Sequence, residues 1–159
     1  MPFADGAFDA ALAVVTVHHW RDLDAGLAEL RRVSRRQVIL TFDVSVHNDH
    51  WLFDYVPEVA ELTERTMPPL DAFGDVEVEV VPMPHDCSDG MIVAMWRRPD
   101  AYLDPSVRAA TSGLSLVDQH VVEAAMARLA DDLRSGAWAR RYGHLLEHET
   151  LDVGLRILS

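Results

Sequence analysis

Two short apolar runs on either side of one amphipathic segment constrain the fold of this chain more than any other feature. Residues 10–17 (AALAVVTV) and 37–44 (QVILTFDV) are mostly apolar and rich in β-branched side chains, which is typical of parallel strands buried on both faces. The segment between them, residues 22–35, carries four apolar side chains at helical spacing: Leu23, Leu27, Leu30 and Val33. A strand, a helix and a strand with short links predict a right-handed βαβ crossover and therefore an α/β fold.

The middle of the chain predicts more helix and then a third strand. A helical stretch is expected from the polar turn at residues 47–49 to Thr66, with a restart at Pro57 and an end at Pro68. Residues 76–80 alternate valine with glutamate, which predicts a strand with one wet face near a sheet edge.

The carboxyl-terminal half predicts helices followed by a last strand. Residues 91–97 fit either a short helix or a strand. Asp118 predicts the start of the clearest helix in the chain, and Gly136 predicts its end. Residues 151–158 predict a final antiparallel strand.

Charge and cysteine content exclude several classes of partner and location. The net charge of -12 argues against nucleic acid or an anionic membrane as partner. A single cysteine, Cys87, has no partner for an internal disulfide. The sequence shows no signal-peptide pattern and no run of roughly 20 apolar residues. We therefore expect a soluble cytoplasmic protein.

Residues 2–20 and 27–33 resemble the middle of class I S-adenosylmethionine-dependent methyltransferases of the type 11 kind. The first segment reads PFADGAFDAALAVVTVHHW, in which a proline-phenylalanine turn and a Phe-Asp pair lead into a strand that ends in His-His. The second reads LAELRRV and matches the Leu-x-Glu-x-x-Arg-Val pattern of the helix that follows. The order and spacing of these pieces carry the resemblance, and shorter similarities continue to the end of the chain in residues 84–87, 96–99, 132–138 and 151–154.

The resemblance implies an α/β fold, namely part of a seven-stranded Rossmann-like sheet. The strands would be equivalent to the family's fourth, fifth, sixth and reversed seventh. We expect a single truncated domain, residues 1–159, with a helical insertion or cap at about residues 83–148. For the complete protein, the implied function is transfer of a methyl group from S-adenosylmethionine to a small-molecule acceptor.

The glycine-rich cofactor loop of this family is missing from the sequence. The eight glycines never occur as Gly-x-Gly, and only a residue without a Cβ lets the methionine part of the cofactor approach such a turn closely. We therefore expect this chain alone to bind the cofactor weakly or not at all, and to be inactive. Three explanations are open: a truncated gene model, which we favour, a non-catalytic methyltransferase-derived domain for interaction or dimerisation, and a split or proteolysed enzyme.

The resemblance places the cofactor beside the first strand. It assigns to cofactor binding Pro2, Phe3, Val15, Thr16, His18, His19 and Trp20. The carboxyl end of a strand in an open α/β sheet is a common ligand site, although Trp20 and one histidine could instead pack under the sheet. His19 has the chemistry of a general base near neutral pH, but nothing in the sequence separates it from His18, so no catalytic residue is assigned.

Other polar side chains have both a functional and a structural interpretation. Asp43 could face a substrate or be a loop carboxylate. His47 and His50 have a spacing compatible with metal ligands, but the sequence places no third ligand, so no metal site is expected. Cys87, in the loop that also carries His85 and Asp86, could be reactive, but a lone cysteine is more often a small buried side chain.

The aromatic residues and methionines of the covering segments could line an apolar acceptor pocket or simply pack, and we favour packing. These residues are Trp51, Phe53, Tyr55, Trp96, Tyr102, Trp138 and Tyr142, with Met67, Met83, Met91, Met95 and Met126.

The strand at Ala10 to Val17 would be central in the complete sheet of this family, so its outer edge is expected to be open here. An unpaired apolar edge is a template for association between chains. We therefore expect a homodimer that buries this edge.

Overall fold

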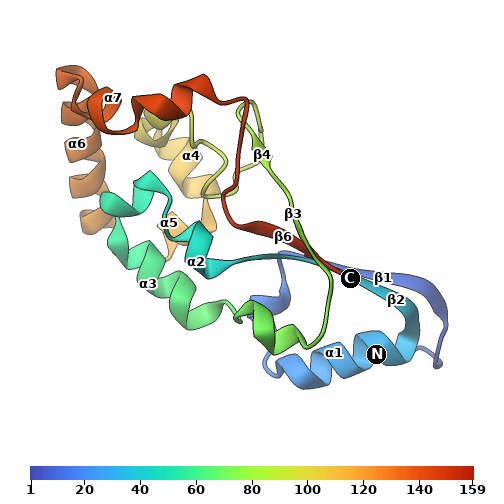
Figure 1. Ribbon diagram of the computed structural model, residues 1–159. Coiled ribbons are helices and arrows are strands. Elements are labelled where there is room, and N and C mark those ends of the chain that lie inside the picture. Colours follow the sequence, from blue (N-terminus) through green and yellow to red (C-terminus); the bar gives the residue numbers. More distant parts are fainter.

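The computed structural model describes all residues from Met1 to Ser159, and its central feature is a mixed four-stranded sheet (Figure 1). The strands are β1 (Phe8–Val14), β2 (Ser34–Phe42), β6 (Leu155–Leu158) and β3 (Val78–Val80), in the spatial order β1-β2-β6-β3. β1 and β2 are parallel, and β6 is antiparallel to both of its neighbours. The prediction of two parallel strands followed by a reversed last strand is therefore confirmed, as is the edge position of β3.

Helix α1 (Leu23–Val33) connects β1 to β2 and covers one face of the sheet (Figure 1). Its first turn is capped by Asp22, whose carboxylate accepts a hydrogen bond from the backbone N–H of Ala25 at 2.9 Å. The predicted apolar stripe points inward, where it packs on the sheet in a small core of Ala13, Val17, Leu27, Ile39, Phe73 and Leu158. None of the helices has the length and apolar character needed to span a bilayer.

The first predicted strand, residues 10–17, is corrected at both ends. β1 starts at Phe8 and ends at Val14, because Val15 has a positive φ of 43° that turns the chain out of the sheet. The following short helix η1 (Val17–His19) buries Val17 to 2% exposure under α1. The apolar run thus extends beyond the strand, because its last residue, Val17, is buried in the small core as part of η1 and not of β1.

The last predicted strand, residues 151–158, is two strands in the structure. Thr150–Leu151 form β5, which pairs with β4 (Met83–Pro84) in a second small sheet, while β6 begins only at Leu155. Gly154 separates β5 from β6 with a φ of 86°, a conformation that an extended strand does not contain.

Residues 91–97 form neither a helix nor a strand but a series of turns. Side chains from outside this segment donate hydrogen bonds to carbonyl groups that would accept backbone N–H groups in a helix. The hydroxyl of Tyr102 donates to the carbonyl of Ile92, and the indole Nε1–H of Trp51 donates to the carbonyl of Trp96 at 2.8 Å. Tertiary hydrogen bonds therefore override the local preference of this segment.

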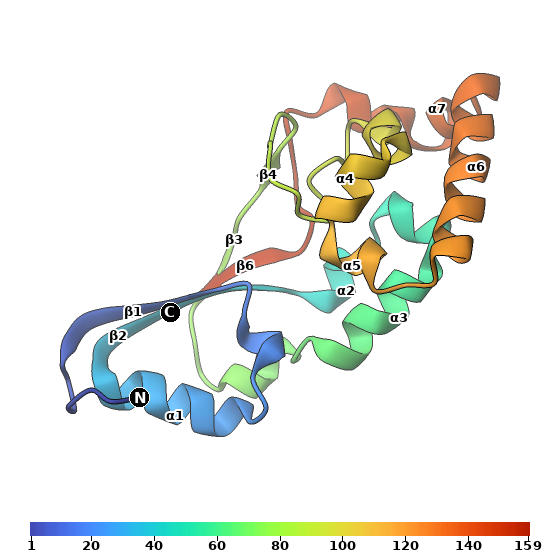
Figure 2. The ribbon, with the colours of Figure 1, turned by 180° about the vertical axis from the view of Figure 1, so that it is seen from behind.

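The helices lie mainly beyond the carboxyl ends of β1 and β2 (Figure 2). After β2 come α2 (Val44–His47), η2 (Trp51–Asp54), α3 (Pro57–Thr66) and η3 (Leu70–Phe73). Between β4 and β5 come η4 (Pro99–Leu103), α4 (Pro105–Ala110), α5 (Ser112–Ser115), α6 (Gln119–Ser135), α7 (Ala137–Tyr142) and η5 (Gly143–Glu147). The predicted boundaries of α6 are confirmed, because Asp118 caps its start and Gly136 follows its end in a left-handed conformation.

A core of 22 buried residues joins these helices to the end of the sheet. Its centre is Trp51, whose ring lies in edge-on contact with those of Tyr102 and Trp138, with centroid distances of 5.6 and 5.4 Å. Trp96 is fully buried beside them and donates its indole N–H to the carbonyl of Met83 at 3.2 Å. The aromatic residues therefore pack, as we expected from the sequence.

One edge and part of one face of the sheet remain uncovered. β1 pairs only with β2, which leaves its outer edge free. Helix α1 covers one face of these two strands and leaves the other face of β1 open (Figures 1 and 2). The exposed apolar side chains of β1 are Phe8, Leu12 and Val14, with 41%, 66% and 52% of their surface accessible. Charged residues and prolines often protect an edge strand from pairing with another chain. In β1 the only such residue is Asp9.

Candidate functional site

The carboxyl ends of β1 and β2 open into a cavity of about 270 Å³. In open α/β sheets, ligands bind at this end of the strands. Three parts of the chain form the walls: the strand ends, α3, and the segment between β4 and β5. The lining residues are Val15, His18, His19, Phe42 and His47, then Val59, Leu62, Thr63, Thr66 and Met67, and finally Met91, Ile92, Ser112, Gly113 and Leu116.

Two histidines of the lining are held in the neutral form. His47 is 2% exposed, and burial lowers its pKa to about 4. Burial and the neighbouring His19 ring, with a centroid distance of 3.9 Å, lower the pKa of His18. The Nδ1 atoms of both His18 and His47 are buried without a hydrogen-bond partner. At neutral pH the wall of the cavity therefore contains unprotonated imidazoles, each with a buried Nδ1 that has no hydrogen-bond partner.

Apart from its three histidines, the lining has no ionisable side chain. It contains no arginine, aspartate or glutamate. The hydroxyls of Thr63 and Thr66 donate to carbonyls of their own helix, those of Val59 and Leu62, at 2.9 Å each. Burial of a charged ligand without a counter-charge is costly, so the cavity favours an uncharged, largely apolar ligand.

Val15 adopts an unfavourable backbone conformation at the mouth of the cavity. A positive φ in a β-branched residue is rare and typically costs on the order of 1–2 kcal/mol. The conformation is held by a 2.8 Å hydrogen bond from the Val15 N–H to the carbonyl of Leu40 on β2. The turn it creates directs the chain into η1, which carries His18 and His19.

Of the residues assigned to the cofactor from the sequence, three line this cavity: Val15, His18 and His19. Thr16 lies between them, at the start of η1, but is not part of the lining. Trp20 packs against the core under α1, where its ring would lie only 2.3 Å from a Cβ on Gly26. Trp20 therefore packs under α1 and does not line the cavity.

Pro2 and Phe3 lie at the opposite end of β1, away from the cavity that Val15, His18 and His19 line. Arg32, at the end of α1, fixes this segment by donating to the carbonyl of Phe3 at 2.8 Å and to the carboxylate of Asp5 at 2.7 Å. The seven residues of β1 separate Phe3 from Val15 by roughly 20 Å, at about 3.3 Å per residue. The Phe3 ring packs edge-on against Phe8 instead.

Asp43 has a structural role and does not line the cavity. Its carboxylate caps α2 by accepting from the N–H of Ser45 at 3.1 Å, and its Oδ2 lies 3.6 Å from a guanidinium nitrogen of Arg156. Arg156 is 5% exposed and also donates to Asp152 at 2.7 Å, a hydrogen bond that lowers the pKa of that carboxyl. This cluster around the buried Arg156 fixes the start of α2 and thereby the position of His47 at its end.

The remaining sequence candidates do not assemble into a site. No group of three or more histidine, cysteine or acidic side chains is arranged to hold a metal ion. The Nδ1 atom of His50 accepts from the N–H of Leu52 at 3.1 Å and caps η2. His85 pairs with Glu149 at 3.1 Å beside the small β4–β5 sheet, and Cys87 is half-buried in the same loop, outside the cavity lining.

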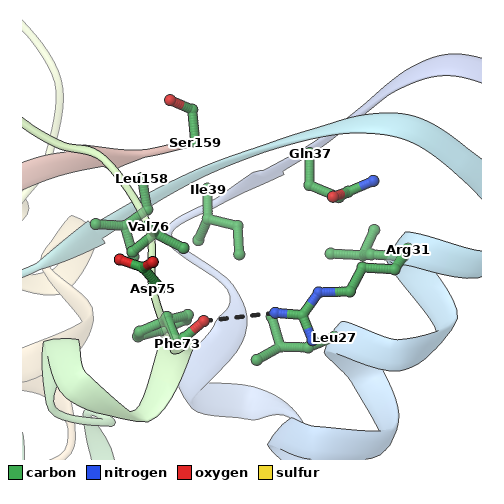
Figure 3. A pocket seen from close by; sticks show the side chains of 10 residues that line it. Leu27, Arg31, Gln37, Ile39, Phe73, Asp75, Val76, Leu158 and Ser159 are labelled. Atoms are coloured by element: carbon green, nitrogen blue, oxygen red, sulfur yellow. Dashed lines mark hydrogen bonds between the residues drawn. The ribbon is translucent and has the colours of Figure 1, made fainter.

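Four other hollows lie away from the end of β1, and two of them border α1 and α2. The first, of about 180 Å³, lies between α1, η3 and the sheet face, where Arg31 donates to the carbonyl of Phe73 at 3.4 Å (Figure 3). The second, of about 510 Å³, lies between α2, α7 and the loop at Asp152. None of the residues assigned to the cofactor lines either hollow, so position in the fold, and not volume, selects the 270 Å³ cavity.

Sequence reasoning missed most of the cavity wall. Phe42 ends β2 and His47 follows it, and both would have been found by applying the strand-end rule to the second strand as well as the first. Met67 and Met91, expected to be core residues, line the cavity. The contributions of Val59, Ile92 and Gly113 carry no sequence signal, since they depend on how α3 and α5 pack together.

Comparison with known proteins gives the family. The model of the methyltransferase domain family matches residues 1–42. A crystal structure from Anabaena variabilis ATCC 29413, of a protein described as a methyltransferase from an antibiotic biosynthesis pathway, matches with a TM-score of 0.90 and 33% sequence identity, over 99% of this chain and 68% of that chain. The chain belongs to the class I S-adenosylmethionine-dependent methyltransferases. None of the curated proteins matches it.

The residues of this methyltransferase fit only one side of a site for S-adenosylmethionine. Val15 and His18 stand at the strand end where such a ligand would lie. The chain offers no glycine at this strand end, because the glycines nearest the cavity, Gly113 and Gly154, belong to α5 and to the turn before β6. The charged amino-acid part of the cofactor therefore finds no close backbone cradle in residues 1–159.

Proposed function

We propose that this methyltransferase transfers the methyl group of S-adenosylmethionine to a nucleophilic atom of an uncharged small molecule bound in the 270 Å³ cavity. The observation that carries the proposal is a cavity at the carboxyl ends of β1 and β2 whose lining is apolar except for uncharged polar side chains. The sulfonium group of the cofactor supplies the electrophilic methyl. Such a displacement depends mainly on the position of the acceptor, which a close apolar cavity can fix.

His18 is the better of the two adjacent histidines for a role at the acceptor. It is half-buried and its pKa is lowered, whereas His19 is exposed. An unprotonated imidazole can accept a hydrogen bond from an acceptor hydroxyl or amine and take its proton. We assign this role to His18, with His47 as a second neutral polar group on the wall formed after β2.

We further propose that residues 1–159 alone bind the cofactor weakly, and that turnover requires a glycine-rich loop from another polypeptide segment. Loss of two to four hydrogen bonds of roughly 1 kcal/mol each weakens binding by about ten- to several-hundred-fold. The missing pocket walls add to this loss.

Calorimetric titration of the purified chain with S-adenosylhomocysteine tests the cofactor proposal. We expect a Kd weaker than about 100 µM, because the chain supplies one wall of the site only. Binding at or below about 10 µM would contradict the incomplete site and show that the chain forms a full pocket. Arg31→Ala, in the separate hollow under α1, serves as a control that should leave the titration unchanged.

A non-catalytic role in association is the second candidate, and the uncovered edge of β1 supports it. We propose that two copies pair along β1, because this edge has free backbone groups, exposed apolar side chains and a single charge at Asp9. Turnover after addition of a complementary glycine-loop segment would favour the enzyme, and stable dimers without any turnover would favour the association domain.

Sedimentation velocity at about 10 µM should show a dimer if this edge associates at micromolar affinity. The double variant Leu12→Lys/Val14→Lys places two charges in β1 and should give a monomer. Leu146→Lys, at an exposed leucine of η5, is the matched control and should remain dimeric. A wild-type monomer would overturn the dimer proposal.

A further inference from the structure

Gly113 lies in α5 on the wall of the cavity, at a position where its backbone does not require glycine. Its φ is not positive, unlike those of Gly6, Gly74, Gly136 and Gly154. Glycine inside a helix is less favourable than alanine by up to about 1 kcal/mol, so its presence here needs another physical reason.

Space is the reason that the contacts indicate. A Cβ on residue 113 would lie 2.8 Å from Cδ1 of Ile92 and 3.2 Å from Cγ1 of Val59. Both of these side chains line the same cavity. A distance of 2.8 Å is too short for two carbon atoms that are not bonded to each other, so a side chain at position 113 must displace the tip of Ile92.

Ile92 is partly buried and lines the cavity, so its displaced tip finds free space on the cavity side. Val59 is 1% exposed and belongs to the main core, so it cannot yield. The backbone of Ile92 is held by the hydrogen bond from Tyr102 to its carbonyl. The Ile92 side chain must therefore move into the cavity, and the accessible space for a ligand shrinks.

We propose that Gly113 and Ile92 together act as a size filter, which sets how large an apolar group the acceptor cavity admits. Because residue 113 has no side chain, the Ile92 side chain can pack directly against α5. The length of the Ile92 side chain then sets the depth of the cavity that is left for a ligand. The ligand class is an uncharged compound with an aromatic ring or short alkyl chain. The identity of this ligand as the methyl acceptor rests on the proposed function.

Binding of phenol and of 4-butylphenol to the purified chain, measured by ligand-observed NMR titration, tests the filter. Gly113→Ala should weaken 4-butylphenol about ten-fold or more, because a methylene-sized change in an apolar pocket has an effect of this order, and should change phenol by less than about two-fold. Ile92→Val deletes Cδ1, the atom at 2.8 Å. The double variant Ile92→Val/Gly113→Ala should therefore restore 4-butylphenol binding.

Gly143→Ala is the matched control, because a Cβ there meets only the Cβ of Ala139 at 4.0 Å and Gly143 does not line the cavity. Equal weakening of both phenols in Gly113→Ala, or failure of the double variant to restore binding, would overturn the filter. So would a wild-type chain that binds neither phenol. If Gly113→Ala does not fold, the single variant Ile92→Val tests the filter. It should bind 4-butylphenol more tightly than the wild type does and leave phenol binding unchanged. The readout is binding, so occupied cavities without methyl transfer would count against the proposed function only.

Discussion

Replacement of Gly154 by alanine is expected to lower the free energy of unfolding by about 2–5 kcal/mol. Two effects add at this position. An alanine with a φ of 86° is strained by about 1–2 kcal/mol, and its Cβ would lie 2.7 Å from both the carbonyl oxygen of Asp43 and the backbone nitrogen of His47. These are backbone atoms, so a side chain cannot rotate away to relieve the contact.

Gly74→Ala separates the two effects. Gly74 has a φ of 83°, but a Cβ there would meet no atom within 4 Å, so this variant should lose the strain component alone, about 1–2 kcal/mol. Chemical denaturation of both variants gives the difference. Equal losses would show that the close approach of Gly154 to α2 does not matter. A larger loss for Gly154→Ala, with weaker phenol binding, would show that this contact holds His47 at the cavity.

Acidification from pH 6.5 to pH 4.5 is expected to reduce the free energy of unfolding by about 5 kcal/mol through two histidines alone. Burial lowers the pKa of His47 to about 4 and that of His50 to about 3, while both would titrate near 6.5 in the unfolded chain. Below pH 6.5 the unfolded state thus binds more protons than the folded state. The stabilisation present above pH 6.5 is lost by about 1.4 kcal/mol per pH unit for each histidine.

Denaturant titrations at several pH values measure this slope. The double variant His47→Gln/His50→Gln should show a much flatter dependence over the same range. His120→Gln, at an exposed histidine of α6, should keep the wild-type slope. The chosen range lies above the ordinary pKa of aspartate, so loss of the Asp152–Arg156 ion pair contributes little to it. A wild-type slope in the double variant would show that other groups cause the acid sensitivity.

Periodicity predicted the elements whose packing is regular. The apolar runs of β1 and β2, the stripe of α1 and the capped α6 were located from sequence, because each presents a repeating pattern to one environment. Residues 91–97 were not, since Tyr102 and Trp51 bind their carbonyls from outside the segment. The break at Gly154 was missed for a similar reason, as its cause is the proximity of α2.

The candidate site was predicted in part, through the strand-end residues Val15, His18 and His19. Pro2 and Phe3 were grouped with them by resemblance alone, and a whole strand separates the two groups. The other walls come from α3 and α5, which meet only in the folded chain. Which histidine is buried also depends on tertiary packing, and so His47 could not be distinguished from exposed histidines by sequence.

The β4–β5 pair has a consequence for how this family can vary. Met83 lies opposite Leu151 and Pro84 opposite Thr150, so the long excursion from His85 to Glu149 leaves and re-enters the fold through one narrow neck. His85 and Glu149 add a side-chain contact at that neck, and a backbone hydrogen bond of 3.0 Å joins the same two residues. A segment whose two ends are neighbours can be exchanged at a single point of the chain path. Grafting residues 85–149 between related proteins would thus transfer one wall of the ligand cavity, Gly113 and Ile92 included, and would require a match to the core that this segment shares with α3 and Phe42.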